Sequence, residues 1–462
     1  MELYWIGWII IPLSIYVFIY KPNILYQLTV FFIPFTGTAV FKISLSSFNA
    51  EGIRVSMFLG FFCLLRHTIS VLLRQKVIYP FNQKQTLNAL FLFSFVVLVS
   101  LIMPIIINGY FSIIDPYFKI GIYYAKTKAL YFSMQYLTQT LYFIFGALIC
   151  YVIVIQNKTS VDIRKTLRVY IFSTFFVSLW GWVEITCYYL NISYPSFLFN
   201  MNSVNLENIP VLMGLPRITS VALEPSIMVQ QMVTVVPILF WDLINKNFIM
   251  QKLTEIIILG YLILTLLLSI SSSAYFGLVS FALIILWELF HRKRMKYWLF
   301  ILVIFMSLLA ITVTPFVLYQ LSLKINTFSG IERWKALTYG WTYFREYPIL
   351  GIGWGVFPSW DLIICILCGS GIIGFSVLLI LLLNIYRKYR SQLKIINTSP
   401  SNSFLNILTL NLVGKHSLII MLVISQFSGF IYHAQYFWFI LGIAIAIAGM
   451  NMNRELTQEA TK

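Results

Sequence analysis

The stretch LIICILCGSGIIGFSVLLILLLN at residues 362–384 decides the fold class, because it contains no charged residue. About 20 mostly apolar residues are enough for one helix to cross a lipid bilayer. Arg387, Lys388 and Arg390 follow directly, and basic residues of this kind gather at the cytoplasmic ends of membrane spans. The stretch therefore predicts a transmembrane helix that ends in the cytoplasm.

The rest of the chain has the same character. Of its 462 residues, 60% are hydrophobic and 17% aromatic, whereas only 10% are charged. An ordinary soluble domain has about 25% charged residues, so this composition excludes a soluble enzyme. No hydrophilic stretch is long enough to bury a core of its own. We interpret residues 1–462 as a single membrane domain.

Apolar runs that could cross a bilayer recur along the whole sequence. We predict an all-α fold, a polytopic integral membrane helix bundle with about 12–13 transmembrane helices and a long outer loop that carries an amphipathic helix. The predicted spans lie near residues 4–20, 24–41, 53–71, 87–107, 136–156, 169–190, 226–245, 254–270, 274–290, 298–318, 362–384, 416–433 and 436–450.

The charge of the chain is +17, from 32 Lys and Arg against 15 Asp and Glu. In a soluble protein this excess would suggest a nucleic-acid partner. In a membrane protein, basic residues collect in cytoplasmic loops, and about two thirds of those here fall in one alternating set of loops. We assign that set to the cytoplasm and expect no nucleic acid. The outer loops are then 108–135, 191–224 and 319–360, and 385–414 is a basic cytoplasmic linker.

All five cysteines lie inside apolar runs: Cys63, Cys150, Cys187, Cys365 and Cys368. The last two form a C-x-x-C pattern, but a structural zinc site needs four converging ligands. No second pair and no nearby histidine accompanies them in the sequence. We therefore expect no metal and no other cofactor, and we assign these thiols to packing.

The large outer loop 319–360 has the pattern of a local helix. Ser329 followed by Glu332 fits a capping box, and Pro348 ends the run. Between them, apolar residues recur at helical spacing: Ile331, Trp334, Leu337, Trp341 and Phe344. We predict an amphipathic helix at the outer membrane interface, where Trp and Tyr favour the headgroup level.

Three basic residues accompany this helix, namely Arg333, Lys335 and Arg345. Each could lie beside the phosphates of a charged ligand. For Lys335 and Arg345, contact with lipid headgroups is an equal alternative, whereas the ligand role is favoured for Arg333. After the helix, the sequence Gly351-Ile352-Gly353-Trp354-Gly355 predicts a sharp turn of the backbone, because glycine adopts conformations closed to other residues.

A second outer element leads from Arg217 into a span through Glu224-Pro225-Ser226. Pro225 suits the first position of a helix, which makes Glu224 the cap residue. A carboxylate there is held ionised by the helix dipole and free backbone N–H groups, so it can accept a proton from a sugar hydroxyl. Two alternatives stay open: Glu224 is only a cap, and Arg217 is only an interfacial anchor.

The predicted topology places one histidine, His433, on the outer side, near the link between the last two spans. His67, His291 and His416 fall on the cytoplasmic side. A histidine can act as a general base near neutral pH. A purely structural role is the alternative reading for His433.

Three places in order carry a family resemblance. They are Arg217 with Glu224-Pro225-Ser226, then Glu332–Leu337 with Tyr347–Gly353 and Gly369–Gly374, and finally Phe437-Trp438-Phe439. Together they resemble the O-antigen polymerase and ligase superfamily of bacterial membrane glycosyltransferases, most closely its Wzy-type polymerase branch. The resemblance covers residues 170–450 and rests on topology and loop order more than on any one motif.

The resemblance implies polymerisation of undecaprenyl-pyrophosphate-linked repeat units at the outer face of a bacterial inner membrane. Donor and acceptor are both lipid-linked glycans, and the product is O-antigen, capsule or exopolysaccharide. Arg217 and Arg333 match the pyrophosphate-binding positions, with Arg345 assisting, and Glu224 or His433 acts as catalytic base. Membrane lipid, a chain-length regulator and a flippase are the implied partners.

Two other functions remain open at this point. A flippase for lipid-linked oligosaccharides would show repeat-related halves and ionisable residues near the midplane, but the halves of this sequence do not align. A ligase would transfer the finished polymer to another acceptor. Ligases of this superfamily usually carry a histidine in the large outer loop, and 319–360 contains none.

Overall fold

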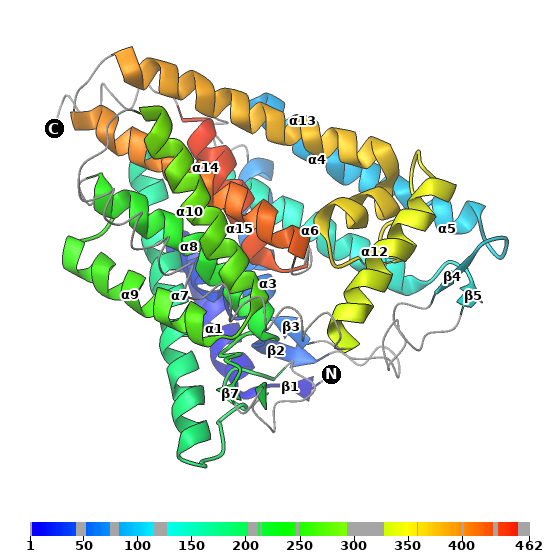
Figure 1. Cartoon of the computed structure of the whole chain (residues 1–462), viewed down its shortest axis with the longest axis horizontal. Coiled ribbons are helices and arrows are strands. Elements are labelled where there is room, and N and C mark those ends of the chain that lie inside the picture. The colour runs from blue at the N-terminus through cyan, green and yellow to red at the C-terminus, as the bar shows by residue number, and fades with distance from the viewer. Residues whose placement is uncertain are drawn as a thin grey trace.

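Helices account for most of the structure, and the remaining elements are short strands (Figure 1). The computed structural model describes residues 2–42, 52–73, 83–114, 127–201, 211–212, 215–245, 249–292, 328–357, 359–398, 402–427 and 433–450. Within these ranges the prediction of an all-α helix bundle is confirmed. The predicted span 298–318 lies outside the described residues.

In the described part of the chain, seven helices are long and apolar enough to cross a membrane, which makes this a multi-pass membrane protein. They are α3 (Val55–Leu72), α4 with α5 (Lys84–Ser100 and Met103–Ile106), α6 (Met134–Gln156), α7 (Ser160–Tyr189), α8 (Pro225–Ile244), α13 (Leu362–Thr398) and α14 (Asn402–Phe427).

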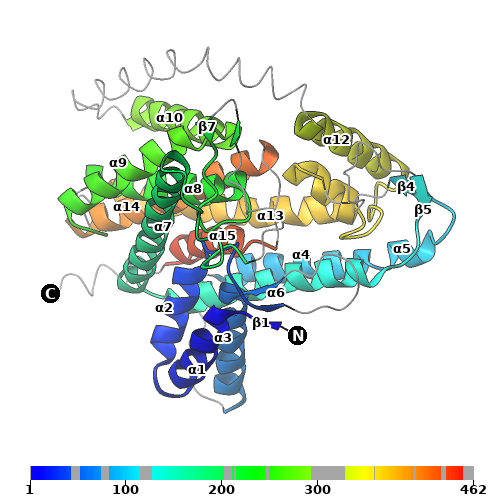
Figure 2. The same ribbon diagram turned by 90° about the horizontal axis from the view of Figure 1, so that it is seen from below.

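Further apolar helices belong to the described part of the bundle. These are α1 (Trp5–Tyr20), α2 (Pro22–Phe32), α9 (Lys252–Leu268), α10 (Ser272–Arg292) and α15 (Gln435–Ala448). Figure 2 shows α1, α2 and α3 as one group at the edge of the bundle, where each packs against the other two. Helix α12 (Phe328–Glu346) packs on α13 at one end of the bundle (Figure 1).

Helix α15 lies at the centre, and every one of its residues is buried. Its sequence is apolar all round, which is the pattern of a helix enclosed by other helices. It packs most closely against α6, where Gly146 makes room for an indole: a Cβ added there would lie 1.9 Å from Trp438 Nε1. Small residues permit such close approach of helices in membranes.

The predicted span 24–41 is wrong as a continuous helix. Helix α2 ends at Phe32, and the chain continues through a buried, irregular stretch into β2 (Ala39–Lys42). Strand β2 pairs antiparallel with β1 (Glu2–Leu3) and β3 (Gly52–Arg54). Irregular backbone at membrane depth is tolerated where protein surrounds it, and the Gly37 N–H here donates to the Val221 carbonyl.

The other strands fall in the segments predicted to be outer loops. They form the hairpins β4 (Ser112–Ile114) with β5 (Thr127–Ala129), and β6 (Val211–Leu212) with β7 (Leu215–Pro216). The segment 385–414, predicted as a basic cytoplasmic linker, is helical over most of its length, because α13 extends to Thr398 and α14 begins at Asn402.

Candidate functional site

The loop that leads into α8 has the local structure expected from Glu224-Pro225. Glu224 occupies the N-cap position in extended conformation, and Pro225 is the first helical residue. The Glu224 side chain nevertheless makes no capping hydrogen bond to the backbone; it is exposed and accepts a hydrogen bond from the Ser226 hydroxyl at 3.2 Å. The Glu224 carboxylate therefore occupies the N-cap position, but its oxygens are not used to cap the backbone N–H groups of α8.

A buried carboxylate on α7, Glu184, fixes the shape of this loop. It accepts hydrogen bonds from the Thr219 N–H at 2.8 Å, the Thr219 hydroxyl at 2.7 Å and the Ser220 N–H at 2.6 Å. Ser220 has a positive φ of 54°, a strained conformation for a residue other than glycine, and strain of this kind persists only where the surroundings over-determine it. Asn200 supplies a further constraint by donating to the Ser220 carbonyl at 2.7 Å.

Glu184 is not among the site residues predicted from the sequence. The available signal was an acidic residue inside the apolar run 169–190, because charged groups within spans are costly and mark functional or positioning sites. The hydrogen bonds that Glu184 accepts from Thr219 and Ser220 show a positioning role. They hold the loop in which Arg217 precedes Thr219 and Glu224 follows it.

Arg217 lies within electrostatic reach of Arg333, although one belongs to the loop before α8 and the other to α12. Burial lowers the pKa of Arg333, the negative charge of Glu224 raises it, and the positive charge of Arg217 lowers it. Burial likewise lowers the pKa of Arg217, which Glu224 partly restores. Both guanidinium groups stay charged. The structure therefore gathers Arg217, Glu224 and Arg333 into one group, which we call the arginine cluster.

Helix α12 directs Arg333 toward the protein. Ala336, Gly340 and Tyr343 form its buried face, whereas the predicted apolar stripe, with Trp334 and Trp341, is exposed. This is the arrangement of a helix that rests on the protein and presents Trp side chains to the membrane interface. Ser329 lies within the helix rather than before it, so the predicted capping position is wrong.

The contacts of Arg333 tie α12 to the rest of the site. One guanidinium nitrogen, Nη1, donates to the carbonyl of Phe427, the last residue of α14, at 2.8 Å. The guanidinium carbon lies 5.5 Å from the centre of the Trp360 ring, within cation–π range. Arg345 is exposed and lies about 18 Å further along the helix axis at 1.5 Å per residue. Arg345 is thus not brought together with Arg333, contrary to the expected assisting role.

The turn after α12 confirms the expectation for its glycines. Gly351, Gly353 and Gly355 all have positive φ. A Cβ at Gly351 would lie 2.2 Å from the Cys368 carbonyl oxygen, so the loop packs directly on the backbone of α13. After this turn the chain enters α13 beside α12. This path brings the Trp360 ring within cation–π range of Arg333.

His433 lies in the link between α14 and α15, next to a third arginine. Arg54 Nη1 donates to the His433 carbonyl at 3.2 Å. Burial, with a further contribution from the Arg54 charge, lowers the pKa of His433 to about 3. The imidazole is therefore neutral at physiological pH, and a group with so low a pKa is a weak base. Of the two predicted bases, Glu224 is the better suited.

Arg54 is a second residue that the sequence analysis passed over. It is buried at the end of β3, directly before α3. Tyr436 of α15 lies within electrostatic reach of both Arg54 and Glu224, and its hydroxyl donates to Gln230 Oε1 on α8. The available signal was a basic residue in an outer loop, on the side where positive charge does not set topology.

The guanidinium groups and the carboxylate of this site are suited to bind an anion and to accept a proton. Guanidinium groups make charge-assisted, bidentate hydrogen bonds with phosphate oxygens, and a nearby exposed carboxylate can accept a proton. Among the described residues, no group of His, Cys, Asp and Glu is arranged to hold a metal ion. No protein-family model matches the chain, and no curated protein matches it.

Proposed function

We propose that the protein is a membrane glycosyltransferase that polymerises undecaprenyl-pyrophosphate-linked oligosaccharide repeat units outside a bacterial inner membrane. The observation that carries the proposal is the arginine cluster, in which Arg333 lies within electrostatic reach of both Arg217 and Glu224, and Arg217 within reach of Glu224. Bringing two arginines together in partly buried surroundings costs free energy through repulsion and lost hydration. A ligand with two or more negative charges, such as a pyrophosphate, would offset that cost.

The reaction follows from the properties of these three side chains. Arg217 and Arg333 bind the pyrophosphate of the donor, and Glu224 accepts the proton of the acceptor hydroxyl. The acceptor oxygen forms a bond to the anomeric carbon of the donor, while the bond from that carbon to the phosphate oxygen breaks. The leaving pyrophosphate gains negative charge, and preorganised cations aimed at developing charge lower such barriers.

Arg54 has a supporting place in this proposal. It holds the main chain at His433, and Arg333 holds the main chain at Phe427. The two arginines therefore fix both ends of the connection between α14 and α15. Anchoring Phe427 and His433 in this way helps to preorganise the site, which matters because small displacements of reacting groups are costly.

The experiment that tests the proposal is an electrophoretic profile of lipid-linked glycans from cells with and without the intact gene. Loss of a polymerase collapses the ladder of chain lengths to a single repeat unit exposed outside the membrane. Single repeat units held inside would identify a flippase instead, and long chains retained on the carrier lipid would identify a ligase. A ladder unchanged by the deletion contradicts all three functions.

A further inference from the structure

A cavity of about 370 Å³ lies between α10, α13 and α14, at the end of the bundle predicted to be cytoplasmic. Leu283, Ile284, Trp287 and Ile419 make most of its lining apolar, and Tyr386 completes the wall from α13. Lys415 and His416 enter it from α14. The cavity therefore combines an apolar wall with charged groups at one place, which is the usual composition of a small-molecule site.

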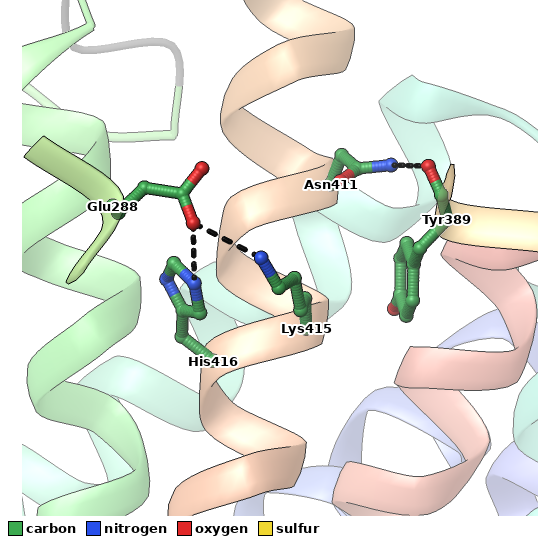
Figure 3. Close-up of polar contacts among 5 residues, drawn as sticks. All are labelled: Glu288, Tyr389, Asn411, Lys415 and His416. Carbon is green, nitrogen blue, oxygen red and sulfur yellow. Dashed lines mark hydrogen bonds and ion pairs between the residues drawn. The ribbon is translucent and has the colours of Figure 1, made fainter. Parts of the chain in front are cut away.

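The charged groups form a compact cluster, drawn in Figure 3. Glu288 of α10 accepts a hydrogen bond from Lys415 Nζ at 3.0 Å, and the same oxygen, Oε2, lies 3.5 Å from His416 Nε2. One turn earlier on α14, Asn411 donates to the Tyr389 carbonyl at 3.4 Å and to Gln392 Oε1 at 2.9 Å, which ties α14 to α13. The cation on α14 and the anion on α10 thus stand side by side, and Asn411 holds α14 against α13.

The position of the cavity suits the headgroup level of a membrane. Glu288 lies four residues before the end of α10 at Arg292, about 6 Å along the axis. Trp287 and Tyr386 are 65% and 54% exposed at the rim, and Trp and Tyr concentrate at membrane interfaces. The rim is open on the outer surface of the bundle, where lipid is the surrounding solvent.

We propose that this cavity binds the headgroup of a phosphatidylethanolamine-type lipid. The phosphate oxygens of the headgroup accept hydrogen bonds from Lys415, whose ammonium group has three donors. The ethanolamine ammonium donates to Glu288 and contacts the faces of Trp287 and Tyr386. Leu283, Ile284 and Ile419 then line the start of an acyl chain. The inference is independent of the proposed glycosyltransferase activity.

The charge pair selects this headgroup over the other common ones. A purely anionic headgroup such as phosphatidylglycerol brings its phosphate next to the Glu288 carboxylate with no cation of its own to offset the repulsion. A choline headgroup carries a positive charge but has no N–H, so it cannot donate a hydrogen bond to that carboxylate. Only a primary ammonium beside a phosphate matches both members of the pair.

The test is a native mass spectrometry titration of the purified, delipidated full chain with phosphatidylethanolamine, phosphatidylcholine and phosphatidylglycerol of identical acyl chains. The wild type is expected to bind the ethanolamine lipid most tightly. Lys415→Met and Glu288→Gln should each weaken that binding roughly tenfold, because each removes one charge-assisted hydrogen bond. Lys252→Met is the matched control: it removes a positive charge from the same end of the bundle, outside the cavity lining, and should change nothing.

A rim variant keeps the test decisive if a variant of the ion pair fails to fold. Trp287→Leu changes a side chain that is mostly exposed, so the fold should tolerate it, and it should weaken ethanolamine-lipid binding several-fold through the lost cation–π contact. Equal or tighter binding of phosphatidylglycerol by the wild type overturns the proposal. So does unchanged ethanolamine-lipid binding in the folded Trp287→Leu protein.

Discussion

The two charged regions of this protein differ in how their positive charge is balanced. At the predicted cytoplasmic end, Lys415 pairs with Glu288 at 3.0 Å on neighbouring helices. In the arginine cluster, burial and then the positive charge of Arg217 lower the pKa of Arg333, and the nearby Glu224 remains exposed. A balanced pair suits a zwitterionic ligand or a structural contact. An excess of cations suits a ligand that brings several negative charges.

The two histidines follow the same division. His416 stands beside the carboxylate of Glu288, whereas the main chain of His433 accepts a hydrogen bond from Arg54, whose charge lowers the pKa of the imidazole. One residue type therefore meets opposite electrostatic surroundings at the two ends. Variants of each region should therefore have different effects on activity and stability.

The largest effect is expected from removing either arginine of the arginine cluster. Arg217→Ala or Arg333→Ala should lower the rate of chain extension about 10²–10³-fold, because a preorganised cation at the leaving group is lost. Lysine at either position should also lose much of the activity, since a point charge replaces a bidentate fork. The measurement is the length of lipid-linked polymer at equal protein levels in membranes.

Arg345→Ala is the matched control for that experiment. It removes the same type of side chain from the same helix, about 18 Å from Arg333 along the axis, and it should reduce activity far less. A normal polymer ladder in both cluster variants would contradict the assignment. An equal loss in Arg345→Ala would show that charge on α12, rather than the cluster, carries the effect.

For Glu224→Gln we expect a somewhat smaller loss of kcat, about 10²-fold, which is the lower end of the range of about 10²–10⁴ that a general base contributes. The side chain keeps its shape there but can no longer take a proton. His433→Gln should retain most of the activity, because its pKa of about 3 already makes the imidazole a weak base. Initial rates of repeat-unit transfer in reconstituted vesicles compare the two. The reverse order of effects would move the base to His433.

The sequence predicted those elements that depend on local pattern. The spans α3, α6, α8 and α13 follow from long, mostly apolar runs, and the cap at Glu224 follows from the adjacent Pro225. It also predicted α12, but the apolar stripe of that helix faces outward. A helix at a membrane interface places its apolar residues toward lipid, so periodicity alone does not show which face contacts the protein.

Contacts between distant segments were beyond prediction. Glu184 meets Thr219 through the packing of α7 against the loop before α8, and Arg54 meets His433 across most of the chain. Neither contact leaves a spacing in the sequence. The β1–β2–β3 sheet was missed for a related reason: its strands are too short to show an alternating pattern, and the run 24–41 is apolar enough to resemble a helix.

Removing Glu184 tests whether the loop geometry matters for catalysis. Glu184→Ala leaves two buried backbone N–H groups without their acceptor, which costs about 1–3 kcal/mol each. Because the loop also carries Arg217, we expect a lower kcat and a higher KM for the donor.

Thr219→Val is the milder comparison, since it removes only the hydroxyl contact. Thermal stability measured on both variants separates the two effects: lowered stability with unchanged kcat and KM would assign Glu184 a structural role alone.

The smallest effect is expected in the acid stability of the protein. The pKa of His433 is about 3 in the folded chain and near 6.5 when unfolded, so protonation favours the unfolded state. The stabilising contribution of the neutral imidazole is fully present above pH 6.5 and is lost progressively as the pH falls toward 3. His433→Gln should therefore show a flatter decline of the melting temperature between these values than the wild type does. Parallel declines in the wild type and the His433 variant would mean that Arg54 and burial do not hold the imidazole neutral, and the contrast between the two ends would then rest on the arginine cluster alone.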